Sequence, residues 1–147
     1  MLQPIRVGHV VLKVRDLDRA LVFYRDLLGF QVASEMSNVM IFLTATGDNH
    51  HDIALLRVGD SAPSPVSTAV GLYHVAVQLA DWDAVKRAHA VLAERGLLRG
   101  SADHGVTRSL YTADPDGNEI ELYCDAPRDE WEGRVDAAMT VKPLALD

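Results

Sequence analysis

The sequence contains an internal repeat, and no other feature limits the possible folds as much. The segment GHVVLKVRDLDRA at 8–20 aligns with YHVAVQLADWDAV at 73–85, at an offset of 65 residues. Further along, NHHDIALLRV at 49–58 aligns with DGNEIELYCD at 116–125, at an offset of 67. The second copy therefore has two additional residues, which we expect in a loop. A repeat of this kind indicates one supersecondary unit present twice.

Each copy has the pattern of a β-α-β-β-β unit. Alternating apolar residues predict strands at 5–14 and 72–80. An apolar stripe predicts a helix after each strand, with Asp18 and Asp81 as the N-caps and Gly29 and Gly96 as the stops. Three short strands complete each copy, about 30–36, 39–45 and 51–56 in the first and 98–102, 107–113 and 118–124 in the second. We therefore predict an α+β fold of two tandem βαβββ modules, with curved sheets around a cleft.

The chain divides into four segments within one predicted domain. Residues 1–58 form the first module and 72–125 the second, and 59–71 is a linker rich in Ser, Pro and Gly. Residues 126–147 form a tail with weak periodicity, which we expect to cover the surface or to contact a partner chain. Exposed sheet edges and an apolar face favour a homo-oligomer.

Charge and composition argue against several classes of partner. The net charge of −7 argues against binding to nucleic acid or to an anionic membrane. No apolar run approaches the roughly 20 residues that a membrane-spanning helix needs, and the N-terminus does not resemble a signal peptide. The single cysteine, Cys124, rules out an intrachain disulfide. These features predict a cytoplasmic protein.

Three residues at related positions of the repeat predict a metal site. Strand alternation places His9, His74 and Glu121 on the face opposite to the one where their apolar neighbours pack. The residue equivalent to Glu121 in the first copy is Ala54, so a fourth protein ligand is absent there and coordination positions stay open. Two histidines and one carboxylate with open positions suit non-haem Fe(II), and Mn(II) is also accepted.

A longer motif accompanies these ligands. In the second copy His104 is followed by Leu110-Tyr111, then by Asp114-Pro115-Asp116-Gly117 and Glu121, and the first copy contains His51-Asp52. Over roughly residues 5–125 the chain resembles the vicinal oxygen chelate superfamily, which includes glyoxalase I, bleomycin-resistance proteins and extradiol ring-cleaving dioxygenases. The motif is most similar to that of one-domain type I extradiol dioxygenases.

The resemblance implies an activity and a role for each residue. Fe(II), or alternatively Mn(II), would be held by His9, His74 and Glu121, and the substrates would be a catechol-type aromatic and O2. His51 would act as an acid–base group, and His104 and Tyr111 would form hydrogen bonds to the substrate. Strict alternation from Ala54 places His51 on the packing face, so its role requires a bulge or a strand that begins after it. The neighbouring His50, otherwise an exposed loop residue, is the alternative.

Two other functions remain open on the same fold. A glyoxalase- or epimerase-like isomerase or lyase usually has four protein ligands, and Ala54 argues against this class. A non-catalytic small-molecule-binding protein, such as a resistance protein, typically lacks the metal ligands, and the presence of His9, His74 and Glu121 argues against that class.

Overall fold

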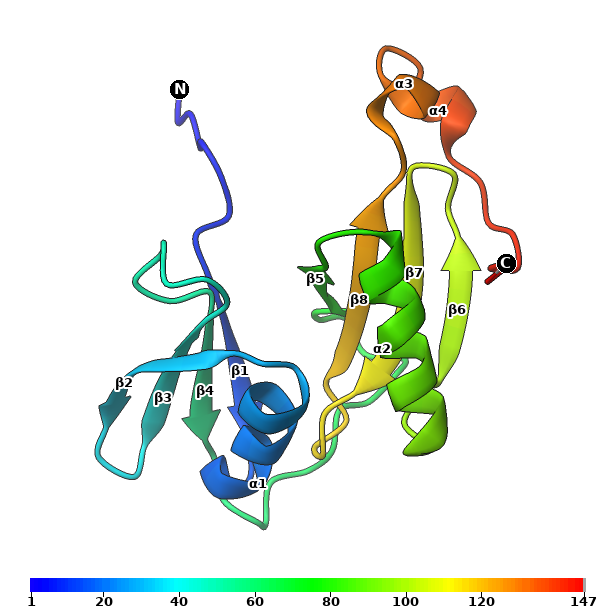
Figure 1. The fold of residues 1–147 in the computed structure, drawn as a ribbon. Coiled ribbons are helices and arrows are strands. Elements are labelled where there is room, and N and C mark those ends of the chain that lie inside the picture. The colour runs from blue at the N-terminus through cyan, green and yellow to red at the C-terminus, as the bar shows by residue number, and fades with distance from the viewer. Residues whose placement is uncertain (147) are drawn as a thin grey trace. The chain divides into compact units, whose positions relative to one another are not determined.

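The computed structural model describes residues 1–146, which form two compact units. Unit 1 consists of Met1–Ala69 together with Asp114–Asn118, and unit 2 consists of Val70–Ala113 with the residues from Glu119 onward. Each unit contains a four-stranded sheet and a helix that covers one of its faces (Figure 1). The predicted α+β class and the two βαβββ modules are confirmed.

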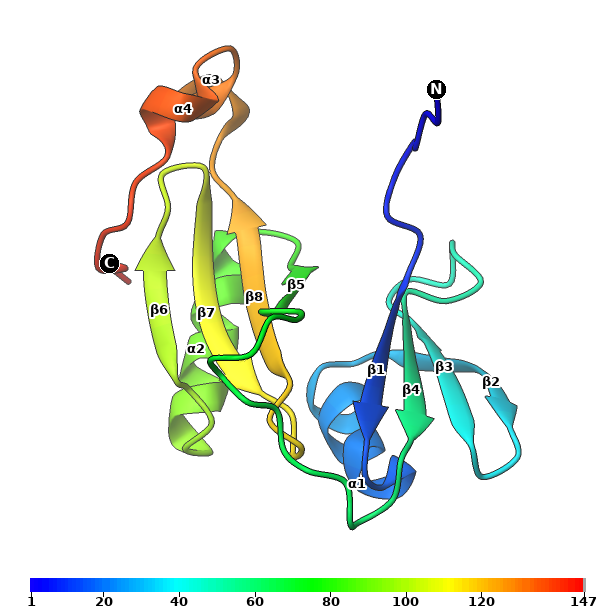
Figure 2. The same cartoon turned by 180° about the vertical axis from the view of Figure 1, so that it is seen from behind.

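Unit 1 has its strands in the spatial order β1-β4-β3-β2. The edge strand β1 is parallel to its neighbour β4, and the other pairs are antiparallel. The helix α1 continues into a wider π-helical segment, η1. Figure 2 shows the face of the sheet that this helix does not cover. The bounds are β1 Val10–Val14, α1 Leu17–Leu21, η1 Val22–Leu27, β2 Gln31–Met36, β3 Met40–Thr44 and β4 Ile53–Arg57.

Unit 2 repeats this topology in the order β5-β8-β7-β6, with β5 and β8 parallel. Val85 and Leu92 of the helix α2 are buried, as are Leu110 of β7 and Ile120 of β8. This buried apolar face of the amphipathic helix is what holds it on the sheet. The bounds are β5 Val75–Gln78, α2 Trp82–Glu94, β6 Gly100–Asp103, β7 Thr107–Ala113 and β8 Glu119–Asp125.

The helices begin at equivalent aspartates in the two copies. The Asp16 side chain accepts a hydrogen bond from the Arg19 N–H, and Asp81 accepts one from the Ala84 N–H. The prediction was correct for Asp81 and wrong for Asp18, which lies inside the first turn. Both caps have extended backbone, which frees the carboxylate to reach the N–H three residues on.

The two additional residues of the second copy lie in its helix, and the expectation of a loop insertion was wrong. In unit 1, α1 and η1 have five and six residues, whereas α2 has thirteen. Both helices then stop at a glycine with positive φ, Gly29 at 85° and Gly96 at 67°. A side chain at such a φ would be strained, which explains the glycine at both ends.

The first strand of each module is shorter than predicted. β1 begins at Val10 and β5 at Val75, so His9 and His74 lie immediately before their strands. The Val10 N–H donates to the Asp52 carbonyl, which precedes β4. Residues before Val10 lack a neighbouring strand in unit 1, so alternation alone overestimated the paired length.

The tail lies on the β6–β7 hairpin. It contains two short helical turns, α3 Arg128–Trp131 and α4 Val135–Ala138, and Lys142 then pairs with Asp103. A side chain at Gly105 would overlap the Ala138 carbonyl, so the approach requires glycine. Asp147, the last residue of the predicted tail, lies outside the described residues. Of the helices formed by residues 1–146, none has the length and apolar character needed to cross a membrane.

Candidate active site

Strand pairing places the repeat-related residues at equivalent positions. In unit 1 Val11 pairs with Ala54, and in unit 2 Ala76 pairs with Glu121. The parallel pair β1 and β4 therefore has the same register as the parallel pair β5 and β8. Ala54 stands where Glu121 stands in the other sheet, as the alignment predicts, and it is completely buried.

In unit 2, Glu121 and His74 are in direct contact. His74 Nε2 lies 2.9 Å from Glu121 Oε2, and His74 Nδ1 lies 3.6 Å from Glu119 Oε1. Glu119 and Glu121 are two residues apart on β8, so their side chains leave the same face of the sheet. The imidazole therefore lies between two carboxylates, one at each ring nitrogen.

The surroundings of this pair fit a divalent cation. Glu121 is only 8% exposed, and among the described residues the one ion-pair partner found for its carboxylate is His74. A buried carboxylate requires compensation by a positive group. His74 Nδ1 is buried without a hydrogen-bond partner, and it faces Glu119. A histidine that binds a metal through one nitrogen usually donates the other N–H to a carboxylate, which is the arrangement that Glu119 offers.

A second hydrogen-bonded pair lies on the same sheet. His104 Nε2 is 2.6 Å from the Tyr111 hydroxyl, and His104 Nδ1 is 3.3 Å from the Thr140 carbonyl oxygen. A carbonyl can only accept, so His104 donates from Nδ1 and accepts the Tyr111 O–H at Nε2. Tyr111 also pairs directly with Glu121 across β7 and β8. Burial, followed by the negative charge of Glu121, raises the pKa of Tyr111, which keeps its proton on the hydroxyl at neutral pH.

In unit 1, His9 lies among other histidines. The ring centroids of His9 and His51 are 4.2 Å apart, and His51 also contacts Phe42 edge-on at 5.1 Å. β4 begins at Ile53, so His51 precedes the strand and is not bound by its alternation. Burial against these rings, together with the charges of His9 and His50, lowers the pKa of His51. A neutral imidazole is therefore favoured there at pH 7.

The six residues predicted for the site fall into two groups. Unit 1 brings His9 and His51 together. Unit 2 brings His74, Glu121, Tyr111 and His104 together. The three predicted metal ligands are thus divided between one residue of unit 1 and two of unit 2.

Sequence reasoning missed two neighbours of these residues. Glu119 faces His74, and the signal was present, because alternation places residues 119 and 121 on one face of β8. His50 Nδ1 lies 2.6 Å from His51 Nδ1. The sequence suggests His50 only as a substitute for His51, because periodicity carries little information about side chains in a loop.

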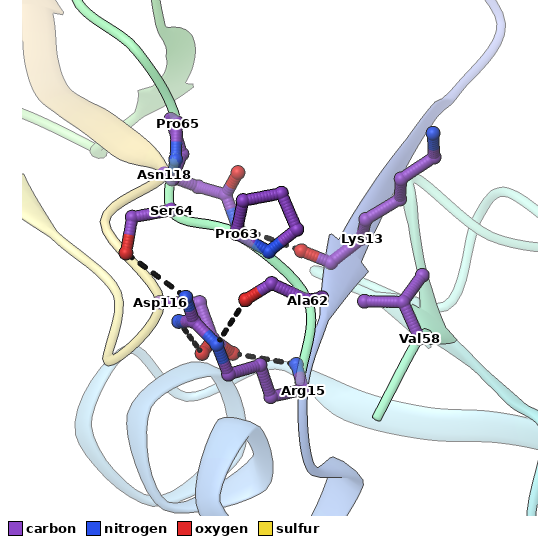
Figure 3. A pocket seen from close by; sticks show the side chains of 9 residues that line it. All are labelled: Lys13, Arg15, Val58, Ala62, Pro63, Ser64, Pro65, Asp116 and Asn118. Carbon is purple, nitrogen blue, oxygen red and sulfur yellow. Dashed lines mark hydrogen bonds and ion pairs between the residues drawn. The ribbon is translucent and has the colours of Figure 1, made fainter. Parts of the chain in front are cut away.

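A cavity of about 470 Å³ lies at another place in unit 1 (Figure 3). Among the described residues that line it, none belongs to the six predicted site residues. The Arg15 guanidinium occupies its wall and donates to Asp116, Ser64 and the Ala62 carbonyl. Because this arginine is fully engaged in holding the segment after β4, we interpret the cavity as structural.

The turn Asp114–Asn118 is fixed by several side chains of unit 1. Asp116 is bound by Arg15 at 2.9 Å and by Arg19 at 2.6 Å. The Tyr24 hydroxyl, fully buried, donates to Asp114 at 3.0 Å. Burial and then the Asp114 charge raise the pKa of Tyr24, so it remains a donor. β8 begins at Glu119, directly after this turn, so the turn anchors the start of the strand that carries Glu121.

Comparisons with known proteins identify the family of the chain. A family model described as the Glyoxalase/Bleomycin resistance protein/Dioxygenase superfamily matches residues 6–122. The chain is 35% identical over 142 residues to a catechol-2,3-dioxygenase of Bacillus subtilis strain 168, covering 96% of this chain and 49% of the relative. It is 37% identical over 122 residues to biphenyl-2,3-diol 1,2-dioxygenase 3 of Rhodococcus globerulus, covering 82% of this chain and 63% of the relative.

A solved structure of a glyoxalase/dioxygenase from Nostoc punctiforme has a TM-score of 0.66 and 26% identity, and the match covers 86% of this chain and 97% of that one. The chain spans about half the length of the Bacillus relative and less than two thirds of the Rhodococcus relative.

Proposed function

The chain belongs to the Glyoxalase/Bleomycin resistance protein/Dioxygenase superfamily, and on this premise we propose that it is an extradiol dioxygenase that cleaves a catechol-type aromatic with O2. The observation that carries the proposal is the unit 2 arrangement, in which a histidine–carboxylate pair lies beside a tyrosine–histidine pair. Relatives named for the cleavage of catechols and biphenyl diols support the substrate class.

His9, His74 and Glu121 would hold the metal, Fe(II) in the first place and Mn(II) as the alternative. A relative named as an iron-dependent extradiol dioxygenase, from Rhodococcus jostii, supports iron. When bound, the ion supplies Lewis acidity to the adjacent hydroxyls of the substrate and open positions for substrate and O2. Glu119 would orient His74 through its Nδ1–H.

Tyr111 and His104 would bind the substrate and hold a proton. Because Tyr111 donates to His104 Nε2, the lone pairs of its hydroxyl oxygen are free to accept from a substrate hydroxyl. A proton passed to Tyr111 Oη can be balanced by the one that Tyr111 gives to His104. Thr140 fixes the His104 ring for this exchange from the tail side.

His51 would supply a second acid–base group. Its lowered pKa leaves the imidazole neutral at pH 7 and able to accept a proton. Its position before β4, in contact with the His9 ring, would place it next to the ion that His9 holds. The aromatic edge of Phe42 limits its rotation.

The isomerase or lyase alternative finds less support. A four-ligand site would need a carboxylate at position 54, where the chain has a fully buried alanine. An alanine supplies no ligand, so an ion held by His9, His74 and Glu121 would keep a position open for substrate or O2.

The activity can be tested with a panel of catechols. Protein purified anaerobically and loaded with Fe(II) should consume O2 and form a yellow ring-opened semialdehyde. No turnover with any catechol, together with an isomerase reaction supported by Ni(II) or Zn(II), would overturn the proposal.

The role of His51 can be tested by His51→Phe. This variant should bind metal and catechol as the wild type does but lose most of its turnover, by about 100-fold or more. His89→Phe, on α2, is the matched control and should retain turnover. Unchanged turnover in His51→Phe would remove this residue from the mechanism.

A further inference from the structure

Unit 1 contains a cluster of three imidazoles, His9, His50 and His51, which we call the unit 1 histidine cluster. One ligand nitrogen from each ring lies within 4.8 Å of the other two. The ring centroids of His50 and His51 are 4.4 Å apart, and those of His9 and His50 are 6.0 Å apart. All three residues belong to one compact unit, so the cluster needs no contribution from unit 2.

The backbone around the cluster is fixed by one amide side chain. Asn49 Nδ2 donates to the His51 carbonyl at 2.7 Å, to the Gly8 carbonyl at 3.2 Å and to Asp52 Oδ1 at 3.1 Å. The residue before His9 is thereby tied to the turn that carries His50 and His51. The fold therefore brings the backbone of the three histidines together.

The donor atoms facing one another are all imidazole nitrogens. The nearest carboxylate in sequence, Asp52, is directed away and accepts from the Ala45 N–H at 2.8 Å and from Thr44 at 3.3 Å. His50 and His51 approach through their Nδ1 atoms at 2.6 Å, a distance at which two lone pairs require a proton or a cation between them. His9 and His50 are exposed, so an ion from solvent can reach them.

We propose that the unit 1 histidine cluster is a second metal site, selective for imidazole-preferring ions such as Zn²⁺, Cu²⁺ and Ni²⁺. Three neutral nitrogens with an open fourth position match a tetrahedral zinc ion, whose ligand distances of about 2.0–2.1 Å are reached by small rotations of the exposed rings. With no carboxylate in the set, the cluster favours these ions over Ca²⁺ and Mg²⁺, and the general order of affinity for divalent metals places Fe(II) below nickel and copper.

The two sites exclude each other because both use His9; this step rests on the proposed function. An ion in the cluster removes one ligand of the iron centre and also occupies His51, the proposed acid–base group. Zinc therefore inhibits in competition with iron loading and not with catechol. The cluster makes the enzyme sensitive to the ratio of zinc or copper to iron around it.

The test is a zinc titration of metal-free protein in the His74→Ala background, in which the proposed iron centre has lost a ligand. Affinity is measured by competition with a chromophoric chelator. We expect His74→Ala to bind one zinc ion. Adding His50→Ala should weaken that binding at least about tenfold, since a lost ligand costs no less than a lost outer partner. Adding His89→Ala, the matched histidine control on α2, should change it less than twofold. Circular dichroism checks that each variant is folded.

Equal zinc affinity in His74→Ala and in His74→Ala/His50→Ala would overturn the site, as would an equal loss in the His89→Ala control. The titration does not depend on turnover. Wild-type protein that cleaves no catechol, with zinc binding that still depends on His50, refutes the proposed function and supports the cluster. Wild-type protein that cleaves a catechol, with zinc binding that does not depend on His50, supports the proposed function and refutes the cluster.

Discussion

The two modules have the same strand order and register but differ in the functional groups that their side chains carry. Val11 pairs with Ala54 in one and Ala76 with Glu121 in the other, so the positions correspond residue for residue. Unit 1 offers only imidazoles at its candidate site, whereas unit 2 offers two imidazoles, two carboxylates and a phenol. The two sheets thus have the same strand register, and the chemical difference between them comes from single side chains at equivalent positions.

The turns before the last strand of each module also share a backbone arrangement and differ in their side chains. Asp114 accepts from the Asp116 and Asn118 N–H groups and organises the turn before β8. Asp52 organises the turn before β4 by accepting from the Ala45 N–H. The turn before β4 carries histidines, and the turn before β8 carries a carboxylate bound by two arginines. In both turns an aspartate accepts hydrogen bonds from backbone N–H groups, but the other side chains that the turns carry are different.

The largest expected effect comes from removing the carboxylate that only unit 2 possesses. Glu121→Ala should weaken Fe(II) binding by more than about 100-fold, beyond the usual range for outer-shell residues. Ala54→Ser, at the equivalent position of unit 1, should change the affinity less than twofold. Iron titration against a competing chelator measures both. Comparable losses in the two variants would contradict the assigned asymmetry.

The second effect concerns the stability of the two turns. Asp116→Ala removes a nearly buried carboxylate that binds Arg15 and Arg19, and should lower the free energy of unfolding by about 2–3 kcal/mol. Asn49→Ala, at the equivalent position, breaks hydrogen bonds between neutral groups and one to Asp52, and should cost about 1 kcal/mol. Urea denaturation gives both values; a larger loss for Asn49→Ala would reverse the comparison.

The third effect is a loss of turnover without a loss of iron affinity, expected for a change in unit 2. Tyr111→Phe removes the hydroxyl that donates to His104 and should reduce turnover about 30-fold, near 2 kcal/mol. Iron affinity should be unchanged, because Tyr111 is not a ligand. Steady-state O2 uptake and iron titration are the two measurements. Full turnover in this variant would leave His104 and Tyr111 with a structural role only.

The smallest effect compares two equivalent acids, Glu119 and Asp52. Glu119 faces His74 Nδ1, whereas Asp52 is bound to backbone N–H of its own turn. Glu119→Gln should weaken iron binding about tenfold, at the lower end of outer-shell effects. Asp52→Asn should change stability but not iron affinity. The assignment of Glu119 as the group that orients His74 is lost if both variants bind iron like the wild type.

Much of this architecture could be predicted because it follows from periodicity and repetition. Alternation identified the strands, and the repeat identified Ala54 as the counterpart of Glu121 before any pairing was known. The helix cap was placed at Asp18 instead of Asp16, since several aspartates near a helix start satisfy the same rule. The extra residues in α2 were missed because a wider helical turn in η1 leaves no mark in the apolar pattern.

The candidate site was predictable only in part, for a related reason. A strand fixes which face a side chain takes, and this suffices for Glu121 and Tyr111. His50, His51 and His104 lie in loops, where orientation depends on hydrogen bonds such as those of Asn49 and Thr140. These bonds join residues far apart in the sequence or lie within one irregular turn, and neither kind has a periodic signature.

The assignment of Asp114–Asn118 to unit 1 has a consequence for how the chain folds. The repeat invites a cut at 59–71 into two independent modules, but the compact unit does not follow that boundary. An isolated first module would bury the Tyr24 hydroxyl without its acceptor. An isolated second module would leave Asp114 without this hydroxyl and Asp116 without its two arginine partners. Each copy lends stability to the other through five residues, so the duplicated gene segments are expected to unfold together and to fail as autonomous fragments.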